Sequence, residues 1–335
     1  MNGRAREAAG RVLGERRGAV PGKAGGEAYA PANIALVKYW GKRDEELKLP
    51  VAGSLSVSLG AWGTRTRVGR REDGSGDRVR LNGKELPGDS GFARRVSAFL
   101  DLTRPREDFA VEVETENTVP TAAGLASSAS GFAALAGALD DWFGWGLSER
   151  ERSVLARLGS GSACRSVGQG FYEWLAGTEE GGGDSYARRV EADWPEFRVG
   201  AVVVDAGEKP VGSGEGMRRA VESCPLFGGW KGTVERDLAG LKSGLAARDW
   251  AAVGGIAEGN AMAMHGLMWA TRPPVVYTQA GTLEAMRKVW AARAEGVGVW
   301  FTMDAGPNVK LLFDAAEEGK VRGWFPEMKV VAGGE

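Results

Sequence analysis

A run of small residues at Pro120–Gly131 has the clearest chemical character in this chain. It reads Pro-Thr-Ala-Ala-Gly-Leu-Ala-Ser-Ser-Ala-Ser-Gly and leads directly into the apolar segment Phe132–Leu139. A glycine turn that opens onto a helix presents unpaired backbone N–H groups and about half a positive charge, which suits a phosphate. The serines add hydroxyl donors, one of them a candidate Mg²⁺ ligand. The run fits neither the P-loop nor G-x-G-x-x-G. From these residues alone, a tight turn capping an ordinary helix remains an equal alternative.

Two further segments combine cations with small or aromatic residues. Asn33–Lys42 carries two lysines, Lys38 and Lys42, beside Tyr39, and such donors suit a polyanion. If the segment is helical, the two lysines share a face. A solvated basic face next to a core tryptophan is at least as good an interpretation of this segment alone. Gly159–Arg165 is a second Gly/Ser run, and its arginine is suited to bidentate binding of a carboxylate or phosphate. Two such loops favour a polyphosphate substrate or two phosphorylated ligands.

A carboxylate and a glycine-rich loop complete the candidate residues. Asp304 ends an apolar strand and is followed by Ala-Gly-Pro-Asn308, so a rigid turn holds it. Capping that turn is the commoner role for such an Asp, while a fixed and partly desolvated carboxylate can also orient or deprotonate a hydroxyl. Glu208–Met217 offers Lys209 and Ser213 in a loop ahead of a helix, which suits a lid, although a plain surface loop is the default.

The composition limits the chemistry that these residues can do. The chain has 335 residues, 43 Lys plus Arg, 44 Asp plus Glu and one histidine. Balanced charge gives no reason to expect nucleic acid or a membrane as partner, and no apolar run approaches the length of a membrane span. A single His265 argues against a His-based triad or a multi-His metal site, so acid–base work falls to carboxylates, lysine or the substrate. Two cysteines, far apart in the sequence, and no secretory signal point to a reduced, cytoplasmic enzyme.

The elements that must position these residues mix strands and helices without strict alternation, so we expect an α+β fold. Strands are predicted at Ser54–Leu59, Phe109–Glu116, Phe171–Leu175, Phe197–Asp205, Gly298–Asp304, Asn308–Phe313 and Met328–Val331, with Thr64–Arg70 and Arg78–Leu81 forming a hairpin. Helices are predicted at 91–100, about 126–143, 148–158, 213–222, 230–246, 249–263 and 278–295. Residues 1–28 are interpreted as a polar extension outside the common core, followed by domains at 29–195 and 196–335.

Taken together, five segments resemble those of mevalonate diphosphate decarboxylases, within the GHMP kinase superfamily. The matching pieces are Ala30–Leu47, Val119–Phe132, Gly159–Ser166, Glu208–Met217 and Asp304–Asn308, in the family order. The resemblance implies a two-domain fold with a ribosomal-protein-S5-like N-terminal domain and a ferredoxin-like C-terminal domain. It also implies ATP-dependent conversion of mevalonate 5-diphosphate to isopentenyl diphosphate, through phosphorylation of the 3-hydroxyl followed by loss of phosphate and CO₂. A homodimer is what the family suggests.

The resemblance also implies roles for single residues. Asp304 is placed beside the 3-hydroxyl, Lys38 next to Asp304, and Arg165 on the substrate carboxylate with help from Asn33. The residues implied for the diphosphate are Tyr39, Lys42, Ser160, Ser162 and Ser213. The residues implied for ATP are Gly124, Ser127, Ser128, Ser130 and Lys209, with Ser127 and Ser128 the favoured hydroxyls. Mg²⁺ is expected mostly on phosphate oxygens and water, with no metal ligand assigned to the protein.

The chain departs from the family pattern after Leu49-Pro50, where Val51-Ala-Gly-Ser54 stands in place of a polar residue and serines. This change leaves the phosphorylation state of the substrate open. Decarboxylation of mevalonate 5-phosphate and simple phosphorylation of mevalonate are therefore sibling alternatives. The kinase is disfavoured because Asp304, Lys38 and Arg165 are all present. A non-catalytic nucleotide-binding protein of the same fold is a third alternative, although such a protein should have lost part of this charged group.

Overall fold

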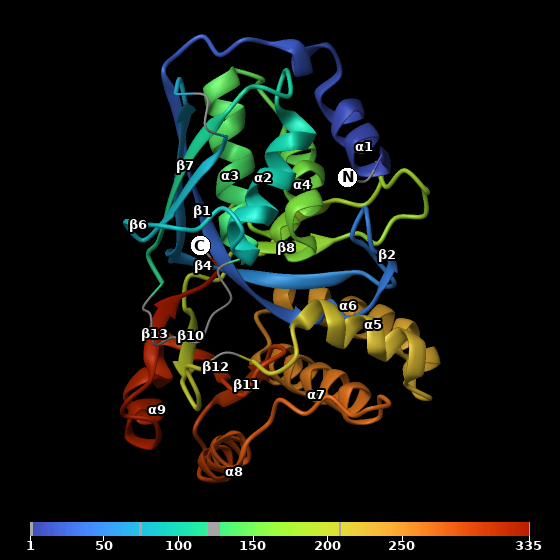
Figure 1. Cartoon of the computed structure of the whole chain (residues 1–335). Coiled ribbons are helices and arrows are strands. Elements are labelled where there is room, and N and C mark those ends of the chain that lie inside the picture. The colour runs from blue at the N-terminus through green and yellow to red at the C-terminus, as the bar shows by residue number, and fades with distance from the viewer. Residues whose placement is uncertain (1–2, 74–75, 120–127, 208, 335) are drawn as a thin grey trace.

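The computed structural model describes residues 3–73, 76–119, 128–207 and 209–334 (Figure 1). A larger sheet with its helices forms the N-terminal half, and a smaller sheet with its helices forms the C-terminal half, which confirms the predicted α+β class. None of the helices among these residues is long and apolar enough to cross a membrane.

The helices are α1 (Gly3–Leu13), α2 (Gly91–Thr103), α3 (Ser128–Phe143), α4 (Glu149–Gly159), α5 (Ser213–Ser223), α6 (Trp230–Ala247), α7 (Trp250–Trp269), α8 (Ala280–Ala294) and α9 (Glu318–Trp324). Short 3₁₀ turns are η1 (Gly14–Gly18), η2 (Gly161–Arg165), η3 (Phe227–Gly229) and η4 (Ala315–Glu317). The strands are β1 (Gly25–Val37), β2 (Lys42–Asp44), β3 (Leu49–Pro50), β4 (Ser54–Arg70), β5 (Arg78–Leu81), β6 (Lys84–Glu85), β7 (Val111–Asn117), β8 (Phe171–Trp174), β9 (Ala187–Val190), β10 (Phe197–Val202), β11 (Val299–Met303), β12 (Val309–Asp314) and β13 (Lys329–Ala332).

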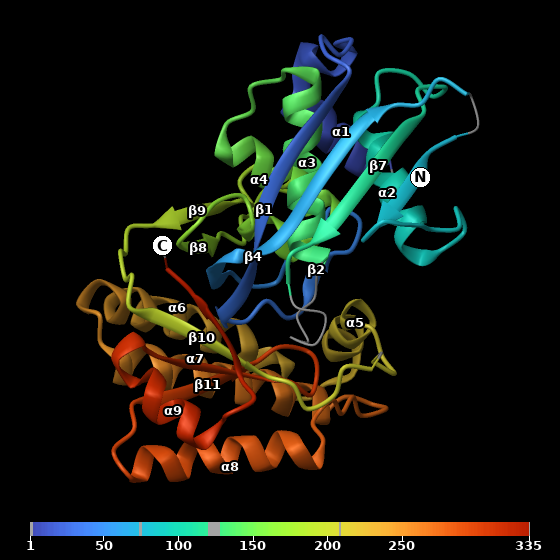
Figure 2. The same ribbon diagram turned by 90° about the vertical axis from the view of Figure 1, so that its left-hand side faces the viewer.

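The long strand β4 organises the N-terminal sheet. The strand order is β6-β5-β7-β4-β8-β9, and β1 pairs antiparallel along β4 (Figure 2). Predicted strands Ser54–Leu59 and Thr64–Arg70 are the two halves of β4, the first paired with β8 and the second with β7. Because β4 continues through both halves, the site end of the sheet is rigidly tied to the rest.

The predicted hairpin between Thr64–Arg70 and Arg78–Leu81 is wrong. Strand β7 lies between β4 and β5, antiparallel to the first and parallel to the second. Parallel neighbours need a crossover connection, and here α2 supplies it between β5 and β7. Alternation of side chains indicates that a segment is a strand but does not say which strand it pairs with, so the error concerns pairing alone.

Helix α3 packs directly on β1, and this contact aims the start of α3 at the site. A Cβ on Gly26 of β1 would come 2.3 Å from the carbonyl oxygen of Ala138, so only glycine allows the approach. Helix α1 packs on α2 and α4, with Ala5, Ala9 and Leu13 buried in the same apolar core. Residues 3–13, predicted as a polar extension, are therefore part of this core.

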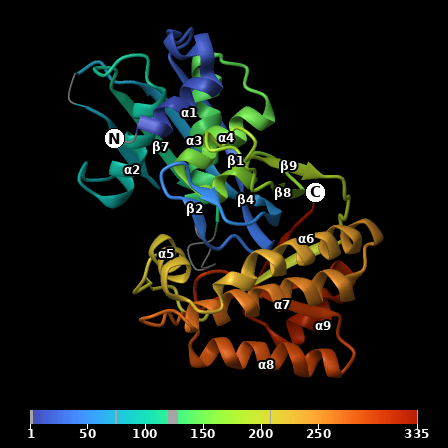
Figure 3. The same ribbon diagram turned by 90° about the vertical axis from the view of Figure 1, so that its right-hand side faces the viewer.

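The C-terminal sheet has the antiparallel order β11-β12-β10-β13. Helices α7 and α8 pack on this sheet, and α6 packs on α7, so that the three helices follow one another in Figure 3. Helices α6 and α7 also contact β1, so one apolar core joins the two halves, with Leu55 and Val57 of β4 against the helices that carry Val234 and Val253. Strand β13 packs against β4 of the first sheet, and just after β13 the amide of Gly333 donates to the carbonyl of Phe197 on β10. Shared packing of this kind fixes the two halves relative to each other.

Candidate active site

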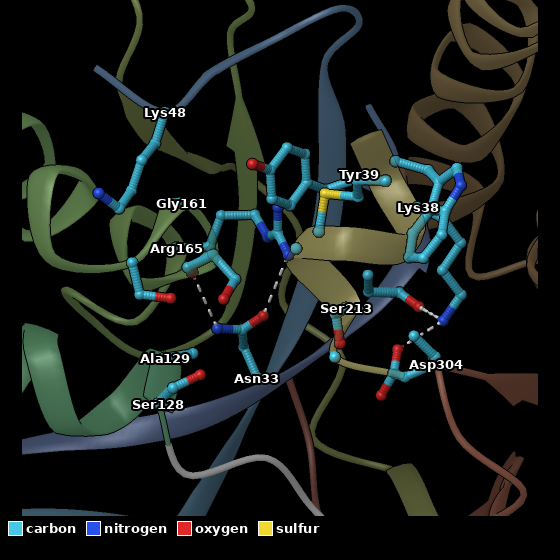
Figure 4. A pocket seen from close by; sticks show the side chains of 18 of the residues that line it. Asn33, Lys38, Tyr39, Lys48, Ser128, Ala129, Gly161, Arg165, Ser213 and Asp304 are labelled. Atoms are coloured by element: carbon cyan, nitrogen blue, oxygen red, sulfur yellow. Dashed lines mark hydrogen bonds and ion pairs between the residues drawn. The ribbon is translucent and has the colours of Figure 1, made fainter. Parts of the chain in front are cut away.

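A cavity of about 450 Å³ lies where the two halves meet, within the range of small-molecule sites. Its walls come from the end of β1, the segment between β1 and β3, η2, the start of α3, the start of α5 and the turn after β11 (Figure 4). The predicted site residues that line it are Asn33, Lys38, Tyr39, Lys42, Ser128, Ser160, Ser162, Arg165, Lys209, Ser213 and Asp304. Segments up to 266 residues apart are thus brought together.

Asp304 and Lys38 form an ion pair at one end of this cavity. Lys38 Nζ donates to Asp304 Oδ1 at 2.9 Å and to the carbonyl of Ala35 at 2.6 Å. Only 2 % of the Lys38 side chain is exposed, whereas 42 % of the Asp304 side chain is, facing the cavity that it lines. Burial opposes ionisation of Asp304, but the neighbouring lysines, Lys38 first, outweigh it and hold its pKa at about 2. Asp304 is therefore an ionised acceptor at neutral pH.

Three residues that the sequence reasoning did not assign support this pair. Lys310 Nζ lies 4.0 Å from Asp304 Oδ2, and burial lowers its pKa to about 8. His265 Nε2 lies 3.1 Å from the backbone oxygen of Asp304, and burial lowers the pKa of His265 to about 4, so the ring is neutral and donates its proton. Asn260 Oδ1 accepts from the amide of Lys38 at 2.8 Å. A charge inside the apolar strand Val309–Phe313 was the available signal for Lys310.

Arg165 is buried in the wall of the cavity and is held from two strands. Its Nε donates to Ser56 Oγ at 3.1 Å, a second nitrogen donates to Ser54 Oγ, and the third lies 3.5 Å from Asn33 Oδ1. Asn33 in turn donates to Ser166 Oγ at 2.7 Å. Serines alternate with apolar residues along the first half of β4. They are buried as well, because they hold this guanidinium.

The other cavity residues divide between two walls. Tyr39 stacks edge-on against Trp174 with ring centroids 4.7 Å apart, and its hydroxyl has no hydrogen-bond partner among the described residues although it is buried. Lys209 Nζ donates to Ser213 Oγ at 3.2 Å and to the carbonyl of Ala305 at 2.6 Å, which places it on the Asp304 side. Lys42 is paired with Glu45. Lys38 and Lys42 lie outside any helix, so a shared helical face does not bring them together.

The start of α3 meets the cavity at Ser128 and Ala129. Gly124 and Ser127, predicted for ATP, lie outside the described residues. Ser130 is fully buried, and its hydroxyl is 2.7 Å from that of Thr64 on β4, away from the cavity lining. Of the four residues predicted for ATP in this loop and helix, Ser128 lines the cavity and Ser130 is bonded to the sheet.

Within the described ranges, no group of three or more His, Cys, Asp or Glu side chains gathers to hold a metal ion. The acid in the cavity, Asp304, already faces two buried ammonium groups. The cavity offers the hydroxyl-bearing start of a helix and several lysines. These groups suit a cation bound through phosphate oxygens better than a cation bound directly by protein carboxylates. The donor set therefore fits Mg²⁺ carried by a nucleotide.

Solved structures of the same fold define the class of protein. A structure titled MDDEF in complex with MVAPP, AMPPCP and magnesium is 40 % identical, with a TM-score of 0.87, and the match covers 93 % of this chain and 97 % of that one. The mevalonate diphosphate decarboxylase of Staphylococcus aureus is 34 % identical with a TM-score of 0.87, over 92 % of this chain and 96 % of that one. The fold is of the GHMP-kinase type, as predicted. The chain therefore falls in the class of ATP-dependent enzymes that have this fold.

The sequence comparisons narrow this class to one family. The diphosphomevalonate decarboxylase-like N-terminal domain matches residues 30–187, and the mevalonate 5-diphosphate decarboxylase C-terminal domain matches 199–328. The human diphosphomevalonate decarboxylase is 39 % identical over 83 % of this chain and 74 % of its own length, and the bovine enzyme 38 % over 89 % and 80 %. The chain belongs to the diphosphomevalonate decarboxylase family.

Proposed function

We propose that Asp304, Lys38 and Arg165 carry the chemistry of ATP-dependent decarboxylation of mevalonate 5-diphosphate, the activity that the family gives this chain. The observation that carries the proposal is the buried Lys38–Asp304 pair, 2.9 Å apart, in one cavity with Arg165 and the start of α3. ATP is the co-substrate and Mg²⁺ the accompanying ion. When bound, Mg²⁺ neutralises charge on the phosphate oxygens.

In this proposal, Asp304 accepts a hydrogen bond from the tertiary 3-hydroxyl and aligns its oxygen with the γ-phosphorus. With a pKa of about 2, the carboxylate is a weak base, so its main work is orientation, with the proton moving to it as the new O–P bond forms. Lys38 places a positive charge beside the same oxygen. Such a division of labour suits phosphoryl transfer, which depends on positioning and charge stabilisation.

Arg165 holds the C1 carboxylate in the proposed complex. Its contacts with Ser54, Ser56 and Asn33 fix the guanidinium plane before substrate arrives. Once the 3-oxygen is phosphorylated, the C3–O bond breaks and phosphate leaves with that electron pair. The bond between C1 and C2 then breaks, CO₂ departs, and its electrons form the double bond of isopentenyl diphosphate. Arg165 keeps the carboxylate aligned for this step. The step itself needs no histidine as an acid or base.

We divide the phosphate-binding residues of the cavity between the substrate diphosphate and ATP. We assign the substrate diphosphate to Tyr39, Lys42, Ser160, Ser162 and Ser213, because all five line the cavity. We assign the ATP phosphates to the start of α3, with Ser128 as the described hydroxyl and Lys209 as an added contact. The role predicted for Ser130 changes in this scheme: its bond to Thr64 positions the first turn of α3.

The sibling activities differ in their products, so one experiment tests the assignment. Purified protein is given ATP and Mg²⁺ with mevalonate, its 5-phosphate or its 5-diphosphate. We expect ADP, phosphate and CO₂ in equal amounts with the 5-diphosphate. ADP without CO₂ would identify a kinase, and turnover of the 5-phosphate alone would identify the other decarboxylase. No turnover of any derivative would exclude an enzyme.

Two wider properties stay predictions. We propose a homodimer, which sedimentation at several protein concentrations tests. We also propose a cytoplasmic location, because both cysteines are free and buried.

A further inference from the structure

The end of the cavity away from Asp304 holds a lysine that none of the roles above uses. Lys48 lies directly before β3 and lines the cavity together with Lys42 and Arg95. Figure 4 shows Lys48 on the opposite side of the site from Asp304, beyond Gly161 of η2. Within the described residues, no hydrogen bond or ion pair reaches its ammonium group. It is a cation without a partner.

The charges around Lys48 are mostly of its own sign. Burial lowers the pKa of Lys48, and the positive charge of Lys42 lowers it further, with smaller effects from Arg157 and Arg95. The acid that opposes this effect is Glu45, which is already paired with Lys42. Like charges held together by the fold are stabilised by an anion placed between them. This end of the cavity is therefore built for an anionic group.

The backbone at Lys48 is also unusual. Its φ is +53°, in the left-handed region that side chains with a Cβ seldom adopt. The turn is fixed on its other side by Asp44, whose Oδ1 accepts from the amide of Leu47 at 2.8 Å. This backbone conformation limits the substitutions that the turn accepts at position 48.

Neighbouring turns supply no charge of their own at this end. The turn after β3 carries Ala52 and Gly53, which have no charged or polar side chain, and a Cβ on Gly53 would come 2.9 Å from the carbonyl oxygen of Trp174. Gly214, beside Lys42 Nζ, lines the cavity with backbone alone. Lys48 is thus placed to provide the cationic contact that these positions lack.

We propose that Lys48 binds the terminal phosphate of the substrate diphosphate and so sets the preference for a 5-diphosphate over a 5-monophosphate. The inference rests on the proposed function, in which the 3-hydroxyl lies at Asp304 and the carboxylate at Arg165. The terminal phosphate is the end of the molecule farthest from that hydroxyl, and Lys42, which is assigned to the diphosphate, is close enough to Lys48 to act on its charge. Nucleotide phosphates are the other source of such an anion, but they are assigned to the α3 wall.

The test replaces Lys48 with Asn, which removes the charge yet tolerates a positive φ. Arg248→Asn is the matched control, because Arg248 has a φ of +50°, carries the same charge and lies outside the cavity. Dissociation constants for mevalonate 5-diphosphate, mevalonate 5-phosphate and ATP are measured by calorimetry, along with kcat and KM for each protein that turns over.

Loss of one charge-assisted contact predicts weaker binding of the 5-diphosphate by about tenfold to a hundredfold in Lys48→Asn. Binding of the 5-phosphate and of ATP should be unchanged, kcat should be nearly retained, and Lys48→Arg should restore most of the affinity. Equal weakening of both mevalonate compounds, weakening of ATP alone, or unchanged binding of the 5-diphosphate would each overturn the assignment. CO₂ release by the unsubstituted protein tests the proposed function separately, so the two failures are distinguishable.

Discussion

Replacing Asp304 with Asn removes one negative charge from a site where two buried lysines share it. Lys38 Nζ lies 2.9 Å from one carboxylate oxygen and Lys310 Nζ 4.0 Å from the other, and their side chains are only 2 % and 3 % exposed. Asn keeps the shape and one acceptor oxygen. It leaves both ammonium groups without a counter-ion, so their pKa values fall further and the site loses positive charge as well as the carboxylate.

The expected magnitudes follow from this geometry. Loss of a positioned proton acceptor lowers kcat by about 10²–10⁴-fold. Breaking a fully buried ion pair costs about 3–5 kcal/mol of unfolding free energy. Because 42 % of the Asp304 side chain is exposed, water screens the charge, and we discount the cost to about 1–2 kcal/mol. ATP affinity should change little, because the start of α3 is untouched and Lys209 is held by Ser213 and the carbonyl of Ala305 rather than by Asp304.

The assay combines CO₂ release, calorimetric binding of ATP and urea unfolding. Asp141→Asn is the matched control, because Asp141 has a similar exposure of 44 % and an ion pair of 2.6 Å to Lys23, outside the active-site cavity. In a Lys38→Met background, Asp304→Asn should cost less stability than it does alone, because the pair is already broken. Retention of kcat within about tenfold, well short of the loss of a positioned acid–base group, would refute the role of Asp304. Equal stability costs in both backgrounds would refute the pairing.

The remaining predictions concern pH. The pKa of Lys310 is lowered to about 8 from 10.5, so kcat should fall above pH 8 as the ammonium group beside Asp304 loses its proton. The Lys310→Met variant should lack this alkaline fall in its pH–rate profile. A fall that persists unchanged in the variant would contradict the prediction. The pKa of His265 is lowered to about 4 from 6.5, so stability is fully present above pH 6.5 and is lost as pH falls toward 4. At about 1.4 kcal/mol per pH unit the loss approaches about 3 kcal/mol. In urea unfolding, the free energy of unfolding of His265→Gln should change less between neutral and acid pH than that of the unsubstituted protein. An equal change in both proteins would exclude His265 as the cause.

Most of the secondary structure could be predicted from residue patterns. The helices α2, α4, α6 and α8 and the strands β7, β10, β11 and β12 lie within a few residues of their predicted positions. Apolar periodicity identifies such elements because each buries one face. Pairing could not be predicted in the same way, as the β4–β5 error shows, since it depends on a crossover through α2. Strand β9 carried no pattern of its own and was missed.

The sequence by itself, through five motifs and their resemblance to the family, identified eleven of the residues that line the cavity, among them Lys38, Arg165 and Asp304, because each motif carries its own side-chain chemistry. Only the tertiary structure decided how those motifs meet. The end of β1 lies against β11, where the Thr302 hydroxyl donates to the carbonyl of Ala35, and this arrangement places Lys38 against Asp304 and removes Lys38 from water. It also recruited Lys310, His265 and Lys48, whose roles depend on distance and burial. The sequence gives the type of each side chain and hence its charge and reactivity. The shift of a pKa and the pairing of a charge depend on burial and on neighbouring groups, which only the folded chain provides.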